Sequence, residues 1–213
     1  MRPILALALL AAPLSAPHSA RAEMPPQAVG SWESIACEMR PQARPDGGVA
    51  PTYLTSAFTH AADGGFQGRI TLYADPACGM AMAEFAFAGE TVWHGPNPAA
   101  PGAVSMDHVL NRALTLTPRA APMAAMLNAL PPGLCADGPL AVGETADLLG
   151  RPCPLLQRVE GAAFVVDHDL IWFHPAAPDL LFLGAKHVDG AGFFTPERRP
   201  TVGLQQPSQR VGG

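Results

Sequence analysis

The sequence predicts a mostly β protein: an antiparallel, partly open β-barrel with one short helix and two disulfides. Three observations support this prediction. Apolar and polar residues alternate with period two in most segments, 24 prolines and 21 glycines separate those segments, and the chain contains four cysteines. Successive side chains of a β-strand point to opposite faces, so such alternation lets one face meet a core. Many short strands separated by turn residues are typical of an antiparallel barrel or a strongly curved sheet.

The N-terminus has the pattern of a signal peptide. Arg2 precedes an apolar run over residues 4–12, Pro13 ends that run, and Ala20-Arg21-Ala22 has small residues at the two positions that a signal peptidase reads. The run is shorter than the roughly 20 apolar residues of a membrane-spanning helix. We therefore expect residues 1–22 to be removed during export.

The rest of the chain is expected to be one exported domain. Residues 23–198 contain no linker or internal repeat that would divide them, and no segment apolar enough to span a membrane after cleavage. Residues 199–213 are polar and rich in proline and glycine, so we expect a partly mobile C-terminal tail. The predicted location is the bacterial periplasm or the extracellular medium.

The charge balance argues against a nucleic-acid partner. The chain has 13 basic and 18 acidic residues, a formal net charge of −5, and the predicted cleavage would remove two arginines and no acidic residue. Nucleic acids and anionic membrane surfaces bind basic patches. Neither is therefore expected as a partner.

The clearest predicted strand covers residues 104–116. Its mostly apolar phase consists of Val104, Met106, His108, Leu110, Arg112, Leu114 and Leu116. Residues 80–93 show the same alternation, and Phe66, Ile70 and Leu72 share one face of another strand. Further strands are expected at residues 30–37, 53–60, 155–160, 163–166, 170–173 and 180–185. A helix is expected only at residues 122–130, where Pro131 ends it, and it would pack across one end or one open side of the barrel.

The four cysteines are Cys37, Cys78, Cys135 and Cys153. An even number of cysteines in an exported chain predicts two disulfides. Their spacing is too wide for a zinc ribbon or a redox pair of the C-x-x-C type. Three pairings are open, and we predict the sequential one, Cys37 with Cys78 and Cys135 with Cys153.

No motif of catalysis or cofactor binding is present. The sequence lacks the nucleophile elbow, the P-loop, the dinucleotide-binding glycine pattern, the zinc-protease helix and the haem attachment motif. His168 and His174 would share one face of a strand, yet they lack a third metal ligand, so two polar residues at strand ends is the preferred interpretation. We predict no cofactor, no metal and no enzymatic activity.

Two polar residues of the strand at 104–116 are candidate ligand anchors. His108 and Arg112 lie on its apolar phase, four residues apart, and a charged arginine is rarely buried without a partner. If this face lines a cavity, Arg112 is placed to bind a carboxylate or phosphate. The alternative is that Arg112 lies at the barrel rim or pairs with an internal acid such as Glu84.

Several stretches resemble the adenomatosis polyposis coli down-regulated (APCDD-type) family of extracellular domains. Gly30-Ser31-Trp32 also has the G-x-W pattern that lipocalins show. The stretches are Trp32 with Cys37-Glu38-Met39-Arg40-Pro41, then Tyr73-Ala74-Asp75-Pro76-Ala77-Cys78, then residues 179–189, and at the end Arg199-Pro200 and Gln205-Gln206-Pro207. The resemblance covers nearly the whole predicted mature chain in the same order.

The resemblance implies a lipocalin-like, partly open barrel with disulfides and an apolar pocket. Animal members carry two such domains before a membrane anchor and bind lipidated Wnt proteins through the acyl chain. Here one domain, no anchor and a bacterial export signal are expected, so only the capacity to hold an acyl chain is carried over. Ala185 stands where the family usually has an acid, which weakens any transfer of residue roles near His187.

Two functions follow as hypotheses. The first is an exported protein that binds a lipid, an acyl chain or another hydrophobic small molecule. Its predicted pocket is lined by Trp32, Phe66, Leu72, Phe85, Phe87, Met106 and Leu110, with His108 and Arg112 as polar anchors. The alternative is an interaction module with a filled barrel and no ligand, whose loops recognise another envelope protein.

Overall fold

The computed structural model describes residues 22–44, 46–156, 162–190, 192, 194–201 and 205–212. Nearly all of the predicted signal peptide therefore lies outside the described residues. The strands are β1 Gly30–Ser34, β2 Glu38–Ala43, β3 Val49–His60, β4 Gly65–Tyr73, β5 Ala81–Pro96, β6 Val104–Pro118, β7 Ala146–Asp147, β8 Val165–His174, β9 Ala177–Leu183 and β10 Ser208–Val211. Two short 3₁₀ turns, Pro26–Ala28 and Pro196–Arg198, and one α-helix, α1 Ala121–Asn128, complete the fold.

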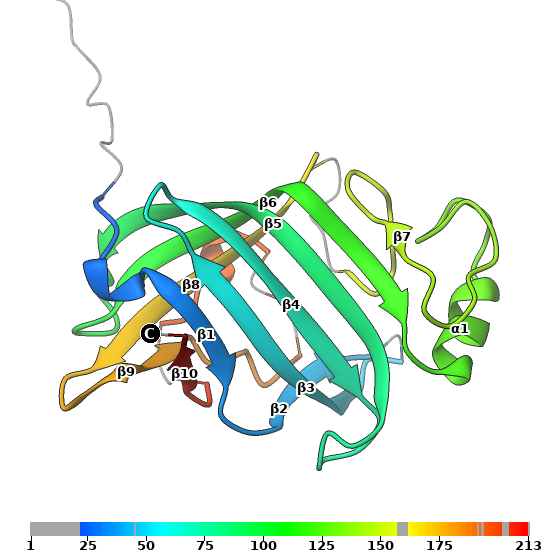
Figure 1. The fold of residues 1–213 in the computed structure, drawn as a ribbon, viewed down its shortest axis with the longest axis horizontal. Helices are drawn as coiled ribbons and strands as arrows, with labels where there is room; N and C mark the ends of the chain where they lie inside the picture. The colour runs from blue at the N-terminus through cyan, green and yellow to red at the C-terminus, as the bar shows by residue number, and fades with distance from the viewer. Residues whose placement is uncertain are drawn as a thin grey trace, which may run out of the picture.

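All strand pairings in the described chain are antiparallel, and the sheet closes on itself. The order is β1-β10-β9-β8-β6-β5-β4-β3-β2, and an additional pairing of β1 with β3 completes a ring. Apart from β2 and β7, the strands of the ring pair in chain order, as in an up-and-down arrangement. The predicted fold class is confirmed: mostly antiparallel β, with one short helix and two disulfides. In Figure 1, β3 to β6 form a broad curved wall, and β8 to β10 complete the ring.

The ring is not a regular barrel because its first strand is broken. β1 pairs with the C-terminal half of β3, with Gly30 opposite His60, while β2 pairs with the N-terminal half, with Glu38 opposite Leu54. The two pairings differ in register by two residues, and Cys37 lies in the irregular step between them. Pairing between β9 and β10 is also short, with two opposed residue pairs. The ring is thus closed by few contacts at β10.

The C-terminal tail predicted at residues 199–213 contains a strand, β10, that the sequence analysis did not expect. Its residues pair with both β1 and β9. Arg210 places its guanidinium 4.2 Å from the ring centre of the fully buried Trp32 and donates hydrogen bonds to the carbonyl oxygens of Val29 and Gln27. Pairing on both sides and a cation–π contact thus hold β10 against the ring.

β5 and β6 are the longest strands, and a bulge interrupts their pairing. Ala88 pairs with Ala113, but Glu90 pairs with Val109, so extra residues of β6 face Gly89. A Cβ on Gly89 would lie 1.8 Å from the carbonyl oxygen of Val109, so only glycine fits there. Arg112 lies in this irregular step, and its side chain is exposed. The period-two pattern that suggested Arg112 as a ligand anchor does not continue through the bulge.

Both predicted disulfides are present. Cys37 pairs with Cys78, and this bond joins the break between β1 and β2 to the turn between β4 and β5. Cys135 pairs with Cys153 and closes the segment that follows α1. Disulfides of this kind form in oxidising settings, so the pair of bonds points to an extracellular or periplasmic location.

The remaining elements agree with the predicted positions, with altered ends. The two short strands expected at 163–166 and 170–173 are one strand, β8. The helix α1 ends two residues earlier than expected and lies beyond the end of β6, beside β7 (Figure 1). Of the strand expected at 155–160, Leu155 and Leu156 lie in a turn and residues 157–160 are outside the described part. No helix among the described residues is long and apolar enough to cross a membrane.

Candidate functional site

A cavity of about 280 Å³, partly open to solvent, lies on the inner face of the ring. Strands β2 to β6, β8 and β9 all contribute to its lining, together with the segment that follows β9. Most of the lining is aliphatic or aromatic, and includes Leu54, Phe58, Phe66, Ile70, Leu72 and Phe85. These residues occupy alternate positions of their strands, so the period-two pattern of the sequence is what directs them inward. The cavity has the concave, mostly apolar character of a small-molecule site.

A second hollow adjoins this cavity. It measures about 390 Å³ and lies between the segment 148–156 and strands β6 and β8. Leu110, Leu114, Leu156 and Val165 line both spaces. Since the two share part of their walls, the apolar surface continues from the ring interior toward the loop that Cys135–Cys153 closes.

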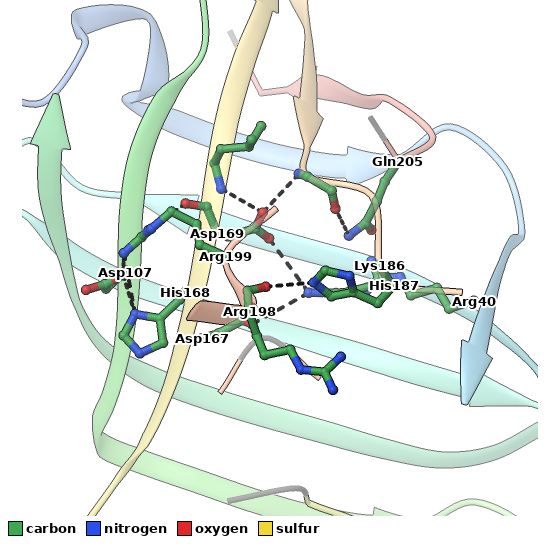
Figure 2. Close-up of polar contacts among 12 residues, drawn as sticks. Arg40, Asp107, Asp167, His168, Asp169, Lys186, His187, Arg198, Arg199 and Gln205 are labelled. Carbon is green, nitrogen blue, oxygen red and sulfur yellow. Dashed lines mark hydrogen bonds and ion pairs between the residues drawn. The ribbon is translucent and has the colours of Figure 1, made fainter. Parts of the chain in front are cut away.

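One end of the cavity carries charged side chains. Lys186, in the segment after β9, has its Nζ 3.5 Å from Asp167 Oδ1 and 3.8 Å from Asp169 Oδ2. Both aspartates come from β8, two residues apart, so they share its inner face. Arg40 of β2 also lines the cavity and pairs with the buried Glu38 at 2.8 Å. Figure 2 shows Lys186 and Arg40 approaching from the same side of the cluster.

Burial changes the protonation of this charged end. The Asp169 side chain is 1% exposed, and burial raises its carboxyl pKa to about 6, against the opposing effect of Lys186. Backbone N–H groups of Leu170 and Gly184 donate to Asp169 Oδ1, which limits the rise. Burial also lowers the pKa of Lys186, although both aspartates favour its charged form. The ammonium and the carboxyl are thus shifted toward their neutral forms.

His108 of β6 lines the same cavity and stacks on Phe66, with ring centres 3.8 Å apart. Burial, reinforced by the charge of Lys186, lowers the pKa of His108 to about 3, so the ring is neutral. Its Nε2 is buried and has no hydrogen-bond partner among the described residues. An unpaired buried polar atom costs about 1–3 kcal/mol.

A separate polar cluster lies on the outer face of the same two strands. Asp107 of β6 has Oδ1 2.7 Å from His168 Nδ1 and 2.6 Å from the guanidinium of Arg199, while Oδ2 lies 2.7 Å from His94 Nε2. Figure 2 shows Asp107, His168 and Arg199 on the opposite side of the drawn cluster from Lys186 and Arg40. Burial alone would raise the pKa of Asp107, but hydrogen bonds from His94 and Arg199 outweigh it and lower that pKa. These contacts hold the C-terminal segment against β6 and β8.

The structure brings together most of the predicted pocket residues. Phe66, Leu72, Phe85, Phe87, Leu110 and the predicted anchor His108 line the cavity. Trp32 and Met106 do not. Both are fully buried, but Trp32 packs under Arg210 at the ring closure, and neither contributes to the cavity wall. Arg112 is exposed beside the bulge, and Glu84, its predicted alternative partner, pairs instead with Arg119.

Sequence reasoning missed the four charged residues of the cavity: Arg40, Asp167, Asp169 and Lys186. Two signals were available. Lys186 is the one lysine in the whole sequence, and Asp167 and Asp169 alternate with His168 in a strand pattern. What was missing is the pairing of β8 with β6 and β9, which determines the face of β8 that lies inside.

The two histidines that were considered as a metal pair, His168 and His174, make separate contacts. His168 pairs with Asp107, and His174 at the end of β8 accepts a hydrogen bond from the backbone of Ala176. Among the residues that the structure describes, no three His, Cys, Asp or Glu side chains are placed to hold a metal ion.

The sequence matches no protein-family model, and a search of curated proteins finds no match. The fold and site therefore define this chain only as a disulfide-bonded antiparallel β protein with an internal, mostly apolar cavity. The APCDD-type resemblance stays a prediction from short motifs.

Proposed function

We propose that this protein is an exported binding protein that holds an acyl chain or another hydrophobic small molecule inside its β ring. One observation carries the proposal: the cavity of about 280 Å³ whose walls are the inward apolar side chains of seven strands. A dry apolar cavity of about 150 Å³ is enough to bind benzene. The space here suits a medium-length chain, and the adjoining hollow gives it room to extend.

The chemistry of the cavity agrees with a binding role. A few polar groups, His108, Lys186 and the two aspartates, stand against one side of an apolar wall, an arrangement typical of ligand sites. The two disulfides suit a protein that works outside the reducing cytoplasm. The lipocalin-like character that the motifs imply would place a ligand in the same interior space. No catalytic role is proposed.

The test measures binding of defined probes to the purified, disulfide-bonded protein. Native mass spectrometry and thermal denaturation are recorded with 1-octanol, octanoic acid and lysophosphatidylcholine. We expect at least one probe to bind with one-to-one stoichiometry and to raise the melting temperature. The variant Ile70→Trp, which fills the cavity from β4, should lower affinity at least tenfold. Gln67→Trp, on the exposed outer face of the same strand, is the matched control and should bind normally.

The outcome distinguishes the proposal from its alternative. Binding that is equally weakened by Gln67→Trp would place the ligand outside the cavity and contradict the proposal. If none of the three probes binds or stabilises the protein, the ring is a scaffold, and recognition of another envelope protein becomes the preferred function.

A further inference from the structure

We propose that Lys186 captures hydrophobic aldehydes by forming a Schiff base inside the cavity. This inference rests on the proposed function and names the ligand class for the same site. The geometry that supports it is the meeting of a primary amine, two carboxylates and an apolar wall in one internal space.

Lys186 is placed where a bound chain would end. Its side chain is 15% exposed, it lines the cavity, and its Nζ faces Asp167 and Asp169. The apolar wall of β3 to β5 lies across the same space, so a chain held there directs a terminal group toward the charged end. His108, whose ring stacks on Phe66, forms part of the wall of the same cavity.

The surroundings of Lys186 suit covalent capture better than a purely structural ion pair. A buried ion pair is weak evidence for stability, because desolvation of the two charges offsets their attraction. Burial shifts the lysine toward the neutral amine that attacks a carbonyl, as in known amine nucleophiles. The groups that face it are Asp167 and Asp169 of β8, Arg40 of β2 and the neutral ring of His108 of β6, and the charge of Arg40 also favours the neutral amine.

The reaction is a balanced condensation. The neutral Nζ attacks the aldehyde carbon, and a C–N bond forms as the C=O π bond breaks. The carbonyl oxygen takes a proton and the nitrogen releases one, which gives a neutral carbinolamine. Asp169, whose pKa is raised to about 6 and whose carboxylate lies 3.8 Å from Nζ, carries these protons. The carbinolamine then loses its hydroxyl group with a second proton as water, and a protonated imine remains. One amine, one aldehyde and one proton thus give one iminium ion and one water, with no oxidant or reductant.

The two aspartates stabilise the product. The iminium charge stays close to where the ammonium charge was, so Asp167 and Asp169 serve it as counter-ions at similar distances. The apolar wall limits access of the water that would hydrolyse the imine. Capture is therefore reversible and most favourable for aldehydes whose chain fills the cavity.

The single lysine makes the test direct. The folded protein is incubated at pH 7 with octanal and sodium cyanoborohydride, which reduces an iminium to a stable amine, and the adduct is located by peptide mapping. We expect one octyl group on Lys186, formed at least tenfold faster in the folded protein than in urea. Acetaldehyde, which gains little from the cavity, should show no such folded-state preference. An excess of 1-octanol should slow the octanal reaction.

Two variants separate the alternatives. Lys186→Arg keeps a cation but has no reactive amine, so labelling at that position must vanish. Arg112→Gln, outside the cavity, should label like the unmodified protein. Labelling of Lys186 at the same rate in urea, or confined to the α-amino group, overturns the inference. If 1-octanol binds but octanal gives no adduct, the binding function is supported and the Schiff base is contradicted. If neither compound binds, both proposals are contradicted.

Discussion

Asp107 and Asp169 lie on neighbouring strands, on opposite faces, and their carboxyl pKa values shift in opposite directions. Asp107 faces outward and receives hydrogen bonds from Arg199 and from two histidines. Its pKa is lowered. Asp169 faces the cavity and receives two backbone hydrogen bonds, while Lys186, the cation that pairs with its carboxylate, is 3.8 Å away. Its pKa is raised to about 6.

The comparison shows that burial alone does not determine the ionisation of a carboxyl. Both side chains are mostly buried, at 13% and 1% exposed. Strong, well-aligned donors compensate Asp107 for lost hydration, whereas Asp169 is held against an apolar space and is compensated only in part. The outer cluster around Asp107 therefore has a structural role. The inner cluster around Asp169 has the character of a site whose charges the protein compensates only in part.

The largest expected effect on stability comes from removing Arg199 from the outer cluster. Arg199 donates to Asp107 and to the carbonyl oxygens of Met106 and Asp169, so Arg199→Ala leaves three acceptors short of a donor. We expect a loss of about 3 kcal/mol in the free energy of unfolding, measured by urea denaturation at pH 7. Arg199→Lys, which keeps the charge but not the planar fork, should recover part of it. Equal stability of Arg199→Ala and the unmodified protein would show that the outer cluster does not fasten the C-terminal segment.

A smaller effect is expected on the pH dependence of stability, with opposite signs at Asp169 and Asp107. Because the folded-state pKa of Asp169 lies above its unfolded value of about 3.9, its contribution to stability decreases as pH rises from about 4 to about 6. In Asp169→Asn this decrease should disappear. The loss in free energy of unfolding relative to the unmodified protein should therefore be about 2 kcal/mol smaller at pH 7.5 than at pH 4.

Asp107→Asn is the mirror control for that experiment. The folded-state pKa of Asp107 is lowered, so its stabilisation is present above its unfolded pKa and is lost as pH falls through the lowered value. The variant should therefore lose the most free energy of unfolding at neutral pH and the least in acid. Urea denaturation of both variants at matched pH values tests the pair, and parallel pH profiles would contradict the assigned difference.

The sequence predicted the ring and its apolar lining because both depend on local alternation. Phe66, Leu72, Phe85 and Leu110 needed only the phase of their own strands to be placed inside. For these residues a short stretch of chain carries the information. The sequential disulfide pairing was predicted from three open possibilities and is confirmed.

The errors arise where distant segments decide the outcome. Arg112 is exposed at a bulge that depends on the contact of Gly89 with β6, which strand phase does not reveal. The strand β10 was not expected, because it is defined by pairing with the distant strands β1 and β9. Lys186 follows β9 without any regular structure, so its position beside Asp169 depends on how β8 and β9 pair.

The smallest expected effect on stability concerns His94, the exposed member of the outer cluster. His94 contacts the second oxygen of Asp107, but its side chain is 41% exposed, so solvent screens the interaction and replaces the lost contact. We expect His94→Gln to lower the free energy of unfolding by no more than about 0.5 kcal/mol at pH 7. Urea denaturation beside Arg199→Ala measures the ratio of the two effects. A loss as large as that of Arg199→Ala would mean that the histidines, and not the guanidinium, compensate Asp107 for its burial.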